Sequence, residues 1–134
     1  MLDHHRALIY TMVIVSAAES DIPDAELRII GDIVGDLPIF RGFDQSELPV
    51  VLNDCTELIS RENGLEHTLK VIKAALPTKL RETAYAIACD LVASDGEAGQ
   101  EELRVLELLR HRLELERLTA AAIERGARAR FQTL

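Results

Sequence analysis

The chain contains no tryptophan, few other aromatic residues and only two cysteines. Cys55 and Cys89 lie in apolar segments without a second cysteine or a histidine at ligand spacing. The sequence therefore predicts two buried thiols, and neither a disulfide framework nor a zinc site. No apolar run reaches the roughly 18 to 20 residues that a membrane-spanning helix needs. No basic leader followed by small residues is visible at the N-terminus, so we expect a cytoplasmic protein.

Positive charge is also scarce, with 15 Lys and Arg against 23 Asp and Glu and a net charge of −8. Because affinity for a phosphate backbone depends on clustered Lys and Arg, we do not expect a nucleic-acid-binding protein. The balance reverses near the C-terminus, where residues 110–134 hold 3 acids and 6 bases. Two interpretations stay open for this tail. It compensates the dipole of a last helix, or it docks onto acidic partners or anionic lipid headgroups.

The abundant signal is a helical period, with apolar residues three and four positions apart and no obvious place for strands. The length of 134 residues suits one domain, so we predict a single all-α domain over residues 1–134. Asp3 and Asp44 are suitable N-caps, and Pro49 is tolerated within a first turn. The seven predicted helices cover residues 3–18, 23–35, 44–60, 64–76, 77–94, 99–112 and 116–130.

An internal repeat appears when the chain is shifted on itself by 76 residues. Residues 18–30 then fall on residues 94–106, acid matches acid at three positions, and a Leu-Arg-aliphatic-aliphatic segment follows in both copies. An apolar helix precedes each copy. Two pseudo-symmetric halves are the simplest explanation, so we expect residues 3–28 to superpose on residues 79–104. The repeat also predicts one shared core that contains Met12, Val15, Leu27, Ile30, Cys89, Val92, Leu103 and Leu106. Exposure of several of these would indicate a wrong period or a homodimer interface.

Each copy carries carboxylates in the pattern acid-x-acid-x4-acid, with two acids in the loop and a third in the first turn of the next helix. We call these two segments the first and second acidic corners. Their oxygens are hard ligands of the kind that Ca²⁺ or Mg²⁺ takes, so both corners are candidate divalent-metal sites. Gly96 permits a positive φ between the loop acids of the second corner. The candidate ligands are Glu19, Asp21 and Glu26 in the first corner and Asp95, Glu97 and Glu102 in the second.

A structural role for these acids stays open, because carboxylates in a first helical turn stabilise the positive end of the helix dipole without any metal. That role accounts for Glu26, Glu101 and Glu102. It does not account for the paired acids in each loop, which repel each other. The pattern is not an EF-hand, since the twelfth position from Asp95 is Leu106 in place of a bidentate Glu.

The segment Val92-Ala93-Ser94-Asp95-Gly96-Glu97, followed by Glu101-Glu102-Leu103 and preceded by a degenerate upstream copy, resembles the tellurite-resistance TerB-like family. The resemblance spans nearly the whole chain. It implies a seven-helix, non-enzymatic, acidic cytoplasmic protein of the stress response that binds divalent metal and engages protein partners, some at membranes. The match in form covers Asp95, Gly96, Glu97 and Glu102. The first corner departs from the family pattern, with Glu19-Ser20-Asp21 in place of Asp-Gly-Glu.

Other candidate chemistry is weaker. His4 and His5 are adjacent, so their side chains should point to different faces of a helix. His67 and His111 are isolated, and Gly31 and Gly35 are better interpreted as sites of close helix packing or a C-cap than as a phosphate-binding loop.

Two alternative functions stay open beside the metal-binding module. One is a metal-dependent hydrolase that uses the second corner, and the other is a helical adaptor that needs no metal. We further predict that the second corner binds a divalent cation more tightly than the first, because a left-handed conformation costs Ser20 more than Gly96. Pro23 also stiffens the first corner, whereas Gly99 leaves the second free to adjust.

Overall fold

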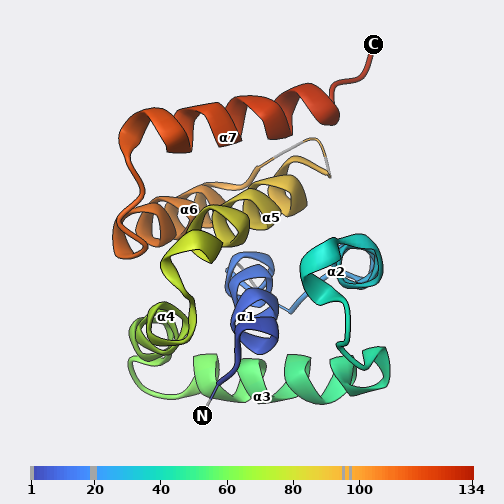
Figure 1. Cartoon of the computed structure of the whole chain (residues 1–134), viewed down its shortest axis with the longest axis vertical. Coiled ribbons are helices and arrows are strands. Elements are labelled where there is room, and N and C mark those ends of the chain that lie inside the picture. Colours follow the sequence, from blue (N-terminus) through green and yellow to red (C-terminus); the bar gives the residue numbers. More distant parts are fainter. Residues whose placement is uncertain (1, 19–20, 95, 97) are drawn as a thin grey trace.

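A computed structural model describes residues 2–18, 21–94, 96 and 98–134. Within these residues the chain forms seven α-helices, three short 3-10 turns and no strand, which confirms the all-α prediction (Figure 1). None of the described helices combines the length and the apolarity that crossing a membrane requires. The α-helices are α1 (His4–Ser16), α2 (Asp24–Asp36), α3 (Leu48–Ser60), α4 (Gly64–Ala75), α5 (Arg81–Ala93), α6 (Gln100–Arg112) and α7 (Arg117–Arg130). The 3-10 turns are η1 (Pro38–Phe40), η2 (Gln45–Glu47) and η3 (Thr78–Leu80).

The helix ends follow the capping residues that the sequence carries. The Asp3 side chain accepts a hydrogen bond from the Arg6 amide at 2.9 Å and starts α1. Asp44 accepts from the Ser46 amide at 2.9 Å, but this bond opens the short turn η2, which then continues into α3. Pro49 lies in the first turn of α3, where its missing amide hydrogen costs no helical bond.

The connection between α3 and α4 requires a glycine. Asn63 adopts a left-handed φ of 56°, and Gly64 follows it as the first residue of α4. A Cβ atom on Gly64 would lie 2.1 Å from the Ile59 carbonyl oxygen, far inside van der Waals contact. Any side chain at this position would therefore force the two helices apart.

The helix bounds preserve the internal repeat. Helix α2 begins at residue 24 and α6 at residue 100, which keeps the offset of 76 residues, and both contain 13 residues. Helices α1 and α5 also contain 13 residues each and pack against each other. The partners cross over, since α2 packs against α5 and α6 packs against α1. The bounds agree with two related halves, and their superposition stays a prediction.

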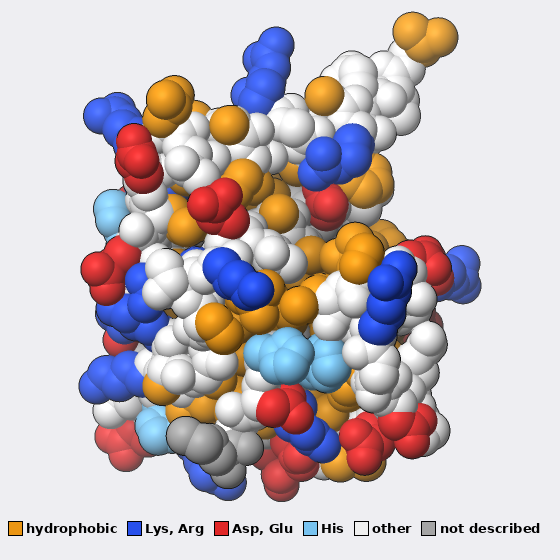
Figure 2. All heavy atoms as spheres, in the orientation of Figure 1, with side chains coloured by type: hydrophobic (Ala, Val, Ile, Leu, Met, Phe, Trp, Pro, Cys, Tyr) orange, Lys and Arg blue, Asp and Glu red, His pale blue; other side chains and the backbone are white. Residues whose placement is uncertain are grey.

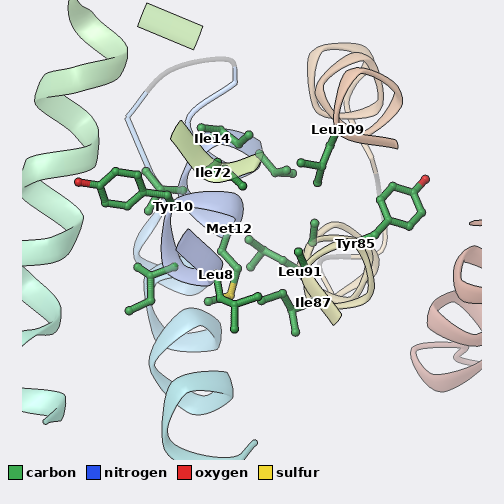
Figure 3. Packing of buried hydrophobic residues seen from close by; sticks show 14 of the residues in the cluster. Leu8, Tyr10, Met12, Ile14, Ile72, Tyr85, Ile87, Leu91 and Leu109 are labelled. Atoms are coloured by element: carbon green, nitrogen blue, oxygen red, sulfur yellow. The ribbon is translucent and has the colours of Figure 1, made fainter. Parts of the chain in front are cut away.

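The core surrounds α1, which lies in the middle of the molecule, with α3 and α7 as the outermost layers on opposite sides (Figure 1). Every residue from Ala7 to Ser16 is buried. In Figure 3, Leu8 and Met12 of α1 meet Leu91 of α5, while Tyr85 projects from the opposite side of α5 toward α7. A helix that is apolar on all sides must be enclosed by other elements, and α1 meets this condition by contacting α2, α3, α4, α5 and α6.

Six of the eight expected core residues are buried, and the other two correct the prediction. Leu103 is 50% exposed, and Leu27 at the equivalent position is only half-buried. The inward stripe on each helix instead passes through a glutamate, Glu26 in α2 and Glu102 in α6. The leucine that follows is rotated by about 100° around the helix axis, which places it at the edge of the stripe. Both copies therefore depart from the prediction in the same way.

Candidate metal sites at the two acidic corners

The first acidic corner connects α1 to α2. Glu19 lies outside the described residues, and Asp21 is exposed. Glu26 is only 5% exposed, in the first turn of α2, and its carboxylate accepts a hydrogen bond from the Ser16 hydroxyl at 3.0 Å. This bond joins the end of α1 to the start of α2, so Glu26 holds the two helices of the first half together at the corner.

The second acidic corner connects α5 to α6. Asp95 and Glu97 lie outside the described residues, but Gly96 between them has a φ of 81°, which confirms the predicted left-handed glycine. Glu102 is 8% exposed, and its Oε1 accepts a hydrogen bond from the Gly99 amide at 3.1 Å. This bond is the glutamate half of a capping box, which satisfies an amide that the start of α6 leaves without a helical partner.

The third acid of each corner thus has a structural role, and its role as a metal ligand stays a prediction. Removing a carboxylate from water is costly unless hydrogen bonds replace the lost hydration, and Glu26 and Glu102 each accept such a bond. A carboxylate offers two oxygens with about four acceptor positions, so a hydrogen bond and a cation can share it. The burial of the same position in both copies marks the corners as built features of the fold.

Convergence of the corner acids on one ion stays a prediction. Among the residues with described positions, no three His, Cys, Asp or Glu side chains are grouped closely enough to hold a metal ion. Three of the six candidate ligands, Glu19, Asp95 and Glu97, lie outside that part of the chain.

The histidines take structural or surface positions. The rings of His4 and His5 lie 4.2 Å apart, closer than the prediction of divergent side chains implied. Nε2 of His5 lies 2.7 Å from the Ile39 carbonyl oxygen, and the His5 ring stacks on Phe40. Both contacts join α1 to the 3-10 turn η1. His67 and His111 are exposed on α4 and α6.

Both cysteines are free and buried, as predicted. Burial raises the pKa of both thiols, that of Cys89 to about 12. Because the thiolate is the reactive form, neither sulfur is an activated nucleophile at neutral pH.

The predicted close packing at Gly31 is wrong, whereas Gly35 has a near neighbour. A Cβ atom on Gly31 would meet nothing within 4 Å, and one on Gly35 would lie 3.3 Å from the flexible Gln45 side chain. Neither glycine ends the helix, since α2 continues to Asp36.

Sequence reasoning missed a groove of about 740 Å³ between α5, α6 and α7. It begins beside the second corner at Gly96 and Ala98 and extends along α7. Leu103 lies in its lining, and no local signal in the sequence separates this leucine from the core residues with which it was predicted.

Comparison of the chain with protein-family models, with curated proteins and with solved structures gave no match.

Proposed function

We propose that this protein is a non-enzymatic binding module in which the second acidic corner holds a divalent cation, Ca²⁺ or Mg²⁺, and the helical surface engages a protein partner. The resemblance to the tellurite-resistance TerB-like family supports a role in the stress response. The observation that carries the cation proposal is the left-handed Gly96 between two acids, next to a buried third acid in the following helix.

The chemistry of this arrangement favours a hard cation. A left-handed residue reverses the local chain direction, which is the turn that a short loop needs to direct flanking carboxylates toward one ion. Carboxylate oxygens, backbone carbonyls and water form the usual shell of Ca²⁺ and Mg²⁺. A cation would also offset the mutual repulsion of two acids separated by one residue.

Calorimetric titration with CaCl₂ and with MgCl₂ tests the proposal. The wild type should bind with a Kd below about 1 mM, and Asp95→Ala with Glu97→Ala should weaken binding at least tenfold, about 1.4 kcal/mol. Asp32→Ala with Asp36→Ala, which removes two exposed acids of α2 away from both corners, is the matched control for charge loss and should bind as the wild type does. The melting temperature of the wild type should rise with the cation, because a ligand of the folded state stabilises it. Equal binding by the Asp95 and Glu97 double variant would refute the cation proposal.

A second candidate, a helical adaptor that needs no metal, is favoured by the hydrogen bonds of Glu26 and Glu102. These bonds show each third acid engaged by its own corner. The adaptor would bind its partner equally well with a chelator present and would show no heat on titration with either cation.

A further inference from the structure

The groove between α5, α6 and α7 has the shape expected of a site for one further helix. Tyr85, Cys89 and Val92 of α5 form its floor. The groove residues on α6 recur at helical spacing and belong to one face, namely Leu103, Leu106, Glu107 and Arg110. Those on α7 follow one stripe along the whole helix, namely Arg117, Ala120, Ala121, Glu124, Ala127 and Arg128. One face of α6 and one face of α7 therefore form the walls of the groove, and α5 forms its base. Figure 2 shows hydrophobic side chains in the space between α7 and the helices beneath it, with charged side chains at the edges.

Helix α7 is fixed in place by α5, so the groove belongs to the fold. Ala120 and Ala127 are 1% and 2% exposed. The Tyr85 hydroxyl donates to the Glu124 carboxylate at 2.6 Å, and Arg130 pairs with Asp90 at 2.5 Å. The small alanines bring α7 close to α5, and two polar links at different points along α7 prevent it from sliding.

The groove exposes two apolar side chains. Leu103 is 50% exposed and Phe131 is 39% exposed, both in the lining. At offset 76, the groove residue Arg110 corresponds to Val34, which is 2% exposed, whereas Leu106 and its equivalent Ile30 are both buried. At the edge of the groove, a partly exposed arginine thus stands where the first half has an apolar core residue.

The charges around the groove select an acidic occupant. Arg110, Arg117 and Arg128 line it, and neither Arg117 nor Arg128 forms an ion pair within the described part of the chain. The described lining also contains Glu107, which is exposed, and Glu124, which accepts the Tyr85 hydroxyl, so three arginines face two glutamates. On a chain with a net charge of −8, two arginines that form no ion pair with any described residue lie beside exposed apolar side chains, and this combination is complementary to a partner that has apolar and acidic groups together.

We propose that this groove binds an amphipathic helix of a partner protein, with apolar residues at i, i+3 or i+4 and i+7 and acidic residues along the edge of that stripe. The incoming helix places its apolar stripe on the exposed side chains of Leu103 and Phe131, and its acids pair with Arg117 and Arg128. The 14 residues of α7 extend over about 21 Å, which matches three to four turns of a partner helix. This inference rests on the partner-binding part of the proposed function and does not require the cation.

Binding of designed 14-residue peptides, measured by fluorescence anisotropy, tests the proposal. The probe carries Leu at i, i+3, i+4 and i+7 with flanking Glu, and two reference peptides of matched helicity carry Lys in place of Glu or Gln in place of Leu. The acidic apolar peptide should bind at least tenfold more tightly than either reference. Equal binding of all three peptides would overturn the proposal.

Variants with matched controls locate the binding site. Leu103→Glu and Arg128→Glu should each weaken binding of the acidic apolar peptide at least fivefold. Leu118→Glu and Arg125→Glu change exposed residues on α7 outside the groove lining and should leave binding unchanged. An equal loss from groove variants and controls would refute the groove as the site.

Two other occupants would contradict the partner-helix proposal. Self-association that Leu103→Glu abolishes would identify the occupant as a second copy of the chain, and sedimentation velocity detects it. Tight binding to phosphatidylglycerol vesicles that Arg117→Glu abolishes, without peptide binding, would identify a lipid surface. Peptide binding that persists in the Asp95→Ala and Glu97→Ala variant separates the groove from the cation site, so either can fail alone.

Discussion

The two halves of this domain share a frame but differ in what covers it. In the first half, α1 is enclosed by α3 and α4 as well as by α5, and Ile9 and Val13 are fully buried. In the second half, α7 packs on the outer side of α5. The described elements thus enclose α1, whereas they leave Leu103 beside the groove half exposed.

The two acidic corners also differ, in the residue that precedes the second helix of each. Pro23 precedes α2 and Gly99 precedes α6 at equivalent positions. Proline fixes its own φ and donates no amide hydrogen, whereas the Gly99 amide donates to Glu102. We therefore expect the first corner to be the stiffer one and the second to adjust more readily to the proposed cation.

The largest expected effect is on the free energy of unfolding, when buried and exposed residues of α2 and α6 are replaced by alanine. Ile30→Ala should lower the free energy of unfolding by about 3 to 5 kcal/mol, because Ile30 is fully buried. Leu106→Ala, at the equivalent position beside the groove, should cost about 2 to 3 kcal/mol. Leu103→Ala, at a half-exposed position, should cost less than about 1 kcal/mol. Urea denaturation measures all three. An equal cost for Ile30→Ala and Leu103→Ala would contradict the assignment of the groove face.

The buried glutamates give the next effect. Glu26→Ala should cost about 1 to 3 kcal/mol, because the buried Ser16 hydroxyl loses its acceptor. Glu102→Ala should cost about 1 kcal/mol through loss of the cap on α6. Thermal unfolding in the presence of a chelator separates these costs from cation binding. A rise in stability for either variant would contradict the prediction, because it would show that the glutamate destabilises the folded state.

Replacing a glycine in each half by alanine should change stability in opposite directions. Gly96→Ala should destabilise by about 1 kcal/mol, since its φ of 81° is left-handed, although a Cβ would meet nothing within 4 Å. Gly31→Ala, inside α2 with open space around it, should stabilise by about 0.5 to 1 kcal/mol. Chemical denaturation of both variants tests this pair. Loss of stability in Gly31→Ala would mean that α2 packs more tightly than described.

The smallest effect concerns the ion pairs that join α4 to the second half. Arg112 donates to Glu66 at 2.7 Å, and Lys73 pairs with Glu114. These hydrogen bonds lower the pKa of both carboxyls below their ordinary value. A carboxyl whose pKa is lowered by folding adds stability above its unfolded pKa, and this stability is lost as the pH falls through the folded value.

Stability should therefore decline slightly between about pH 5 and pH 3, and Glu66→Gln should reduce the slope. Glu57→Gln, an exposed position on α3, is the control and should leave the slope unchanged. Urea midpoints across this pH range measure the effect. Identical profiles for Glu66→Gln and the wild type would show that the pair is screened by solvent.

Local signals in the sequence were sufficient to predict the helices. Capping at Asp3, Pro49 in a first turn and the left-handed Gly96 depend on neighbouring residues alone, and all three were predicted. The repeat was visible because its acids and leucines recur at one offset.

What the sequence could not supply was the arrangement of α7 relative to α5 and α6. The helical period predicts Leu103 as a core residue. Its exposure depends on how α7 is placed. The position of α7 is determined by Ala120, Ala127 and the hydrogen bond from Tyr85 to Glu124, which join distant segments. Long-range contacts of this kind leave no local pattern, so the groove was missed.

The central claim is that binding belongs to the second half of the repeat. Amide chemical shifts recorded during a Ca²⁺ titration of ¹⁵N-labelled protein test it most directly, because they report both corners in one sample. Amides around Gly96 and Gly99 should shift first, and those around Asp21 and Ile22 should shift only at severalfold higher Ca²⁺. Shifts that begin at the first corner would contradict it, as would no shift at either corner up to about 1 mM Ca²⁺, a concentration that corresponds to a binding free energy of about −4 kcal/mol.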